Sequence, residues 1–148
     1  MKRRFLLRLL PLAGGIALLL RPLLAAAGWN TKAFTATTEQ DALNALFPGT
    51  RIEPSDAIRI ETHDVVENGA YVPVQIESTL PDVDLISIVV EKNPNPLIAQ
   101  FELNPRCRAF VATRIKVGEP SDVAAVIRSR GRLFSARRFV EVVEGGCN

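Results

Sequence analysis

Turn-forming residues recur at short, regular intervals after Pro54, and this spacing restricts the segments between them to the length of short strands. Apolar and polar residues alternate in residues 58–61 and 71–77, the period of a strand with one buried face. Residues 85–90 are almost continuously apolar, which is typical of a central strand. Further strands are expected at residues 98–103, 109–117, 123–128 and 133–143. Seven or eight short strands predict a mainly β fold, an immunoglobulin-like β-sandwich.

One short helix is expected before the strands, within residues 29–47. Thr38 followed by Asp41 resembles a capping box at its start, and Pro48 with Gly49 ends it. The apolar stripe that would face the core consists of Ala42, Leu43, Ala45 and Leu46. The continuous run at 85–90 needs cover on both of its faces. We therefore also expect a partner chain to bury what one small sandwich leaves exposed.

The first 27 residues have the order of an export signal. Basic residues at 2–4 and 8 precede an apolar run at 9–20, and Ala25-Ala26-Ala27 supplies the small residues that a signal peptidase reads. The run is shorter than the roughly 20 residues that span a membrane. We expect a signal peptide at 1–27, for which we favour the twin-arginine route, then a sandwich domain at 28–143 without a membrane span, and a C-terminal arm at 144–148.

Charge argues against nucleic acid as a partner. Five of the 18 basic residues and none of the 16 acidic ones lie in residues 1–27, so residues 28–148 hold 13 basic and 16 acidic residues and a net charge of −3. Residues 106–138 are locally basic, with nine basic side chains and two acids. Two interpretations stay open: a solvated strand face, or a surface that meets an acidic partner or steers an anion.

The C-terminal arm holds the most informative side chain, the thiol of Cys147. It follows Gly145 and Gly146, and glycines favour a flexible, thin arm that can enter a narrow active site. The four residues after Val143 extend by about 14 Å at ~3.4 Å per residue. A thiolate there is suited to accept sulfur or to form a mixed disulfide. The alternatives are an incidental cysteine and a structural disulfide with Cys107, which two glycines would serve poorly.

Other candidates for chemistry are weak. Cys107 lies between Arg106 and Arg108 and is interpreted as a tolerated loop cysteine. His63 is the sole histidine, so neither a metal site nor a fixed Cys–His pair is predicted. No glycine-rich phosphate loop or haem attachment sequence occurs, and no cofactor is expected.

Several segments together resemble a known family. They are Trp29-Asn30, the Asp41-Ala42-Leu43 segment of the helix, Glu67-Asn68-Gly69-Ala70, Val72-Pro73-Val74, the run Val90-Glu91-Lys92-Asn93-Pro94-Asn95-Pro96-Leu97, and Gly145-Gly146-Cys147. In these residues the chain resembles SoxY, the sulfur-carrier subunit of the bacterial thiosulfate-oxidising Sox system. Asn148 stands where that family usually has two more glycines.

The resemblance implies a periplasmic carrier that holds thiosulfate-derived intermediates covalently on Cys147 and is not itself an enzyme. It implies a haem-containing enzyme that joins thiosulfate to the cysteine, a hydrolase that releases sulfate and leaves a persulfide, and enzymes that oxidise the remaining sulfane sulfur. It also implies a heterodimer with SoxZ, a second small sandwich protein. The alternative is an exported binding or adhesion module whose C-terminal cysteine is incidental or structural.

Overall fold

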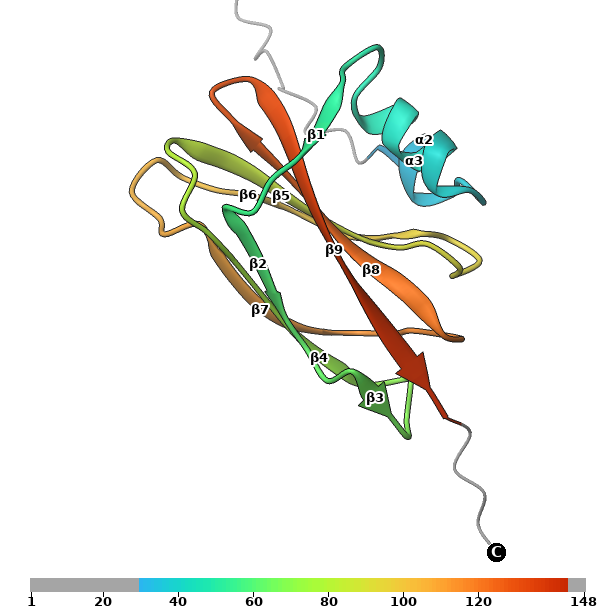
Figure 1. Cartoon of the computed structure of the whole chain (residues 1–148). Helices are drawn as coiled ribbons and strands as arrows, with labels where there is room; N and C mark the ends of the chain where they lie inside the picture. Colours follow the sequence, from blue (N-terminus) through green and yellow to red (C-terminus); the bar gives the residue numbers. More distant parts are fainter. Residues whose placement is uncertain (1–29, 144–148) are drawn as a thin grey trace, which may run out of the picture.

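The computed structural model describes residues 30–143, which form two β-sheets with two short helices on one side (Figure 1). The helices are α2 (Thr31–Phe34) and α3 (Glu39–Leu46). The strands are β1 (Ile52–Pro54), β2 (Ile58–Glu61), β3 (Val65–Val66), β4 (Val72–Ser78), β5 (Val83–Val90), β6 (Leu97–Glu102), β7 (Phe110–Ile115), β8 (Ser121–Ser129) and β9 (Arg132–Val142). This confirms the expected mainly β sandwich. The predicted signal at 1–27 and arm at 144–148 lie outside the described residues.

The larger sheet has six strands and the smaller sheet has three. The larger one runs β1-β9-β8-β5-β6, with β3 also paired to β9, and the smaller one runs β2-β4-β7. Both β1 and β3 pair in parallel with β9, at its beginning and at its end. These two strands were not expected from the sequence, because they have three and two residues and exist through their pairing with β9.

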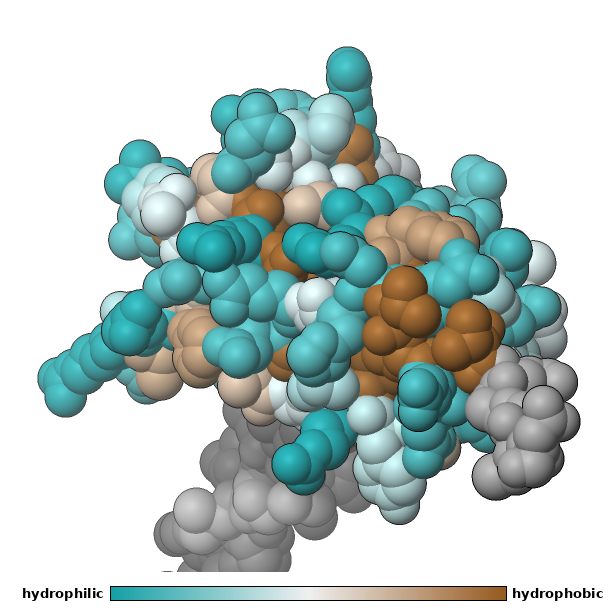
Figure 2. All heavy atoms as spheres, turned by 60° about the horizontal axis from the view of Figure 1, so that its bottom comes forward, coloured by the Kyte–Doolittle hydropathy of each residue, from teal (hydrophilic) through white to brown (hydrophobic). Residues whose placement is uncertain are grey.

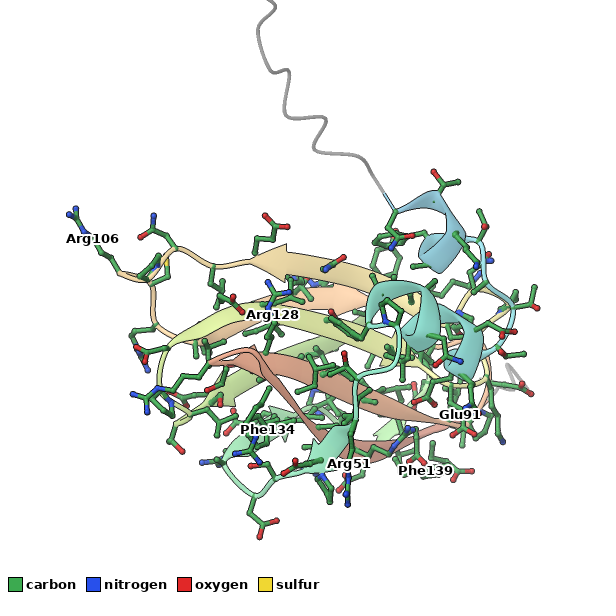
Figure 3. The ribbon with its side chains drawn as sticks, turned by 90° about the horizontal axis from the view of Figure 1, so that it is seen from above. Arg51, Glu91, Arg106, Arg128, Phe134 and Phe139 are labelled. Carbon is green, nitrogen blue, oxygen red and sulfur yellow. The ribbon has the colours of Figure 1, made fainter. Side chains whose placement is uncertain are left out.

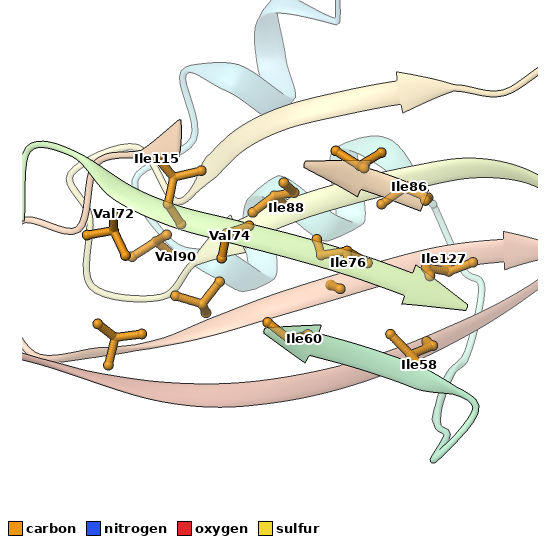
Figure 4. Packing of buried hydrophobic residues seen from close by; sticks show 14 of the residues in the cluster. Ile58, Ile60, Val72, Val74, Ile76, Ile86, Ile88, Val90, Ile115 and Ile127 are labelled. Carbon is orange, nitrogen blue, oxygen red and sulfur yellow. The ribbon is translucent and has the colours of Figure 1, made fainter. Parts of the chain in front are cut away.

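The main core fills the space between the two sheets (Figure 4). Val74 and Ile76 of the smaller sheet face Ile86, Ile88 and Ile127 of the larger one, and each of these side chains is at most 1% exposed. Alternation along β4 explains this arrangement, because every second residue of a strand points to the same face.

The helices cover the outer face of the larger sheet. Val89 packs in one cluster with Ala33 and Ala42, and Leu85 packs in another with Phe47. The apolar run of β5 is therefore buried on both faces within this chain: alternate residues enter the main core and the helix-covered clusters. The expectation that this run needs a partner chain for cover was wrong.

Two helices stand where one was expected. Asn30 caps α2, its side chain accepting a hydrogen bond from the Ala33 N–H at 3.1 Å. Thr38 caps α3, accepting from the Asp41 N–H at 3.1 Å and donating to the Asp41 carboxylate at 2.7 Å, so the predicted cap is confirmed. The extended backbone of Thr38 separates the helices.

Two tight connections fix the register of the larger sheet. Arg130 and Gly131 join β8 to β9 with φ of 49° and 74°, the positive values that a two-residue hairpin loop requires. The β5–β6 connection consists of residues 91–96, between Val90 at the end of β5 and Leu97 at the start of β6. Its Asn-Pro pairs favour extended and turn conformations over helix.

Candidate functional site

The candidate residues Gly145, Gly146 and Cys147 lie outside the described residues, but the structure describes the point from which they continue. Strand β9 pairs with β8 along nearly its whole length, from Arg132 to Val140. On its other side the Glu141 N–H donates to the Asp64 carbonyl at 2.8 Å, and the Val143 N–H donates to the Val66 carbonyl at 3.0 Å. The chain is thus held by hydrogen bonds up to its last described residue, four positions before Cys147.

Gly69 packs the β3–β4 loop against the base of the arm. Its carbonyl accepts a hydrogen bond from the Val117 N–H at 2.7 Å. A Cβ on Gly69 would stand 2.1 Å from the Val117 carbonyl oxygen and 3.1 Å from Cγ1 of Val142. Such distances exclude any side chain, so the glycine of the Glu67-Asn68-Gly69-Ala70 segment permits the loop, the residues after β7 and the end of β9 to meet.

Asn93 connects the next two loops at the same end. It is only 8% exposed, and its amide nitrogen donates to the Lys116 carbonyl at 2.7 Å while its amide oxygen accepts from the Gly118 N–H at 2.9 Å. The Lys92 N–H donates to the Ser121 hydroxyl at 3.0 Å. The sequence indicated this segment only through the resemblance, and the structural role of Asn93 was missed because its burial becomes visible only in the fold.

Two of the segments that carry the resemblance, residues 67–70 and 90–97, therefore meet at one end of the sandwich. Gly69 contacts Val117 through backbone atoms and lies beside the Val142 side chain, and the Lys116 carbonyl accepts from the Asn93 side chain, so a continuous set of contacts runs from Val142 to the β5–β6 loop. Among described residues this region adjoins the end of β9, after which the sequence of the arm begins. We call it the arm base.

The basic residues of 106–138 do not form one cationic surface. Arginines of this stretch pair with carboxylates on other strands: Arg108 with Glu77, Arg128 with Asp84, Arg130 with Asp82, Arg132 with Glu53, Arg137 with Glu39 and Arg138 with Asp64. The hydrogen bonds that Arg137 donates to the Glu39 carboxylate raise the pKa of Arg137 above its ordinary value. These pairs favour the interpretation of a solvated, charge-balanced surface over one that steers anions.

Cys107 is exposed in the β6–β7 loop, on the opposite side of the molecule from the end of β9 (Figure 1). The guanidinium of neighbouring Arg108 is directed to Glu77 at 2.7 Å. Cys107 is among the residues that line an open pocket of about 270 Å³, together with both polar and apolar neighbours. His63 is exposed just before β3. Within residues 30–143, no three His, Cys, Asp or Glu side chains gather closely enough to hold a metal ion.

Comparison with known proteins identifies the chain's relatives. The family model described as "Sulfur oxidation protein SoxY" matches residues 43–147. The chain belongs to the SoxY family. The matched range begins inside α3 and includes Gly145, Gly146 and Cys147, so it spans both the sandwich and most of the arm. No curated protein matches the chain.

Solved structures similar to this chain include a sulfur carrier and a superoxide reductase. The sulfur carrier protein SoxY from Chlorobium limicola f thiosulfatophilum has 35% sequence identity and a TM-score of 0.67, covering 77% of this chain and 99% of that one. A superoxide reductase (neelaredoxin) from Ignicoccus hospitalis has a TM-score of 0.53 at 15% identity, covering 59% of this chain and 80% of that one, and shares the fold alone. Of the helices in residues 30–143, none has the length and apolar character needed to cross a membrane.

Proposed function

We propose that this protein is a periplasmic sulfur carrier that holds thiosulfate-derived intermediates covalently on Cys147. The observation that carries the proposal is the spacing between anchor and thiol. Val143 is hydrogen-bonded to Val66, and a Glu-Gly-Gly sequence separates it from Cys147. A cysteine joined to a fixed strand through glycines can be presented to several active sites in turn. Membership of the SoxY family and the carrier from Chlorobium support the same role.

The chemistry that this role asks of the chain is modest. The Cys147 thiolate joins the sulfane sulfur of thiosulfate with loss of two electrons to a haem-containing partner enzyme. Water and a hydrolase then release sulfate and leave a persulfide on the cysteine, which further enzymes oxidise. The carrier keeps each intermediate attached, so successive enzymes meet it at high effective concentration. No catalytic group is assigned to residues 30–143.

Three further elements belong to the proposal. The basic, apolar and small-residue order of residues 1–27 supports export. A SoxZ-like subunit is proposed as the heterodimer partner because the chain belongs to the SoxY family. The burial of β5 does not contribute to this proposal, because the chain itself covers both faces of that strand. Cys107 is proposed to form no disulfide with Cys147. The strand β7 alone extends about 17 Å at ~3.3 Å per residue between the Cys107 loop and the arm base, which exceeds the reach of about 14 Å from Val143 to Cys147.

Intact-mass analysis of the protein purified from its native host tests the assignment. We expect a fraction whose added mass corresponds to sulfane or sulfonate groups, maps to Cys147 and disappears on thiol reduction. Cys147→Ser should remove the adduct and abolish thiosulfate-dependent turnover with purified partner enzymes, and Cys107→Ser is the matched control that should spare both. A quantitative Cys107–Cys147 disulfide, with stability lost on reduction, would instead make Cys147 a structural cysteine.

A further inference from the structure

Three exposed apolar side chains lie together where β9 ends: Val65, Phe139 and Val143, here called the arm-root patch. Their exposed fractions are 60%, 50% and 39%. Phe139, Glu141 and Val143 alternate along the chain and so share one face, while Val65 stands opposite Glu141 in the β3–β9 register. Seen from this end of the molecule, the surface has a compact apolar area amid hydrophilic side chains (Figure 2).

The patch is the part of this sheet face that the helices leave bare. At the beginning of β9, Leu133 is 2% exposed because it packs in one cluster with Phe47. The helix cover does not extend to Phe139, which lies at the periphery of the molecule (Figure 3). On the opposite face of the same segment, Val140 is fully buried in the main core. The end of β9 is thus apolar on both faces, but the described part of the chain buries only one of these faces and leaves the other exposed.

The length of the arm determines what approaches this patch. Cys147 lies four residues beyond Val143, a reach of at most about 14 Å. An enzyme that takes the thiol into an active-site channel must bring the rim of that channel within this distance of Val143. Because Val143 is itself part of the arm-root patch, a channel rim at that distance contacts the patch.

We propose that the arm-root patch is the docking surface for the enzymes that act on Cys147, each of which meets it with apolar side chains around the channel that receives the arm. This inference rests on the proposed carrier function and adds the surface that the enzymes share. Apolar contact suits a site used by several partners, because it requires no fixed pattern of hydrogen bonds.

The size of the patch favours a visiting enzyme over a permanent subunit. A stable interface buries about 800 Å² on each partner and is more apolar when the complex is obligate. Three side chains with the Glu141 carboxylate among them offer much less than that. A subunit resident on the patch would also stand between the short arm and any enzyme.

Kinetics with variants of the patch test the proposal. The double variant Val65→Ser with Phe139→Ser, loaded with thiosulfate, is offered to the purified sulfate-releasing hydrolase of the Sox system. We expect KM for the carrier to rise about tenfold with kcat nearly unchanged, because docking weakens but the bound arm reacts as before. Phe110→Ser is the matched control: Phe110 is also exposed, at 41%, but its partner in register is Glu77, at the far end of β4. It should leave KM unaltered.

Each other outcome is informative. Equal KM for the wild type, the double variant and the control would overturn the docking surface while leaving the carrier function intact. Loss of the SoxZ-like subunit from the double variant in sedimentation would assign the patch to that subunit and overturn it as well. If the double variant is less stable, Phe139→Ser alone, at a half-exposed position, repeats the measurement. The carrier function fails separately, if Cys147→Ser still supports turnover.

Discussion

The carbonyl oxygen of Val117 lies 2.1 Å from the position that a Cβ on Gly69 would take, and the N–H of the same Val117 donates to the Gly69 carbonyl at 2.7 Å. The two backbones touch directly, so this position of the arm base admits glycine alone. The contact fixes the loop that precedes β4 to the connection that follows β7, beside Val142 at the end of β9.

Gly69→Ala should be markedly destabilising, because a methyl group there must displace backbone and not a movable side chain. We expect the free energy of unfolding to fall by about 2–4 kcal/mol, measured by urea denaturation. Gly118→Ala is the control, since a Cβ at Gly118 would find its nearest neighbour, the Asn93 amide oxygen, at 3.4 Å. Equal stability of the two variants would contradict the close contact at Gly69.

Asn93→Ala should also destabilise the arm base. It removes two side-chain hydrogen bonds, to Lys116 and from Gly118, at a site that water scarcely reaches. We expect a loss of about 1–3 kcal/mol in thermal or urea unfolding. Asn95→Ala offers a comparison two residues away, because the exposed Asn95 amide makes one long bond of 3.4 Å to the Ala36 carbonyl. That variant should stay within about 0.5 kcal/mol of the wild type.

Ser87→Ala should leave the protein as stable or make it more so. Ser87 is fully buried in β5, and its hydroxyl oxygen finds no hydrogen-bond partner among residues 30–143. Removing an unpaired buried hydroxyl recovers its desolvation cost, a gain of about 0–1 kcal/mol. A clear loss of stability in urea unfolding would mean that the hydroxyl has a partner after all, such as a buried water.

Stiffening the arm should slow the handling of Cys147 without removing its thiol. Gly145→Val with Gly146→Val introduces β-branched side chains that restrict rotation and thicken the segment. We expect a lower rate with partner enzymes, an unchanged unfolding midpoint and unchanged labelling by a small disulfide reagent. Gly145→Ala with Gly146→Ala should fall between this variant and the wild type. Full activity of the valine variant would show that the glycines are not needed for access.

Much of the fold is predictable because its strands are defined by local patterns. The alternation at β2 and β4 and the apolar run at β5 each appear as expected. Strands β1 and β3 could not be predicted, because their few residues become strands only by pairing with β9, which is distant in sequence. The burial of Asn93 likewise arises from two loops that fold together. Cys147 was predicted from the sequence as the working residue, and it lies outside the described residues, so it stays a prediction.

The pairing of β9 has a mechanical consequence for the proposed carrier role, in which partner enzymes take hold of the C-terminal end. Because β9 runs antiparallel to β8 and parallel to β3, a pull on Val143 along the strand loads both sets of hydrogen bonds sideways and together. Hydrogen bonds loaded in this shear geometry must break together, whereas hydrogen bonds at the end of a strand that is peeled away break one at a time. Tension on the arm, as when an enzyme releases it slowly, is therefore spread over the larger sheet and does not unravel the strand to which the arm is attached.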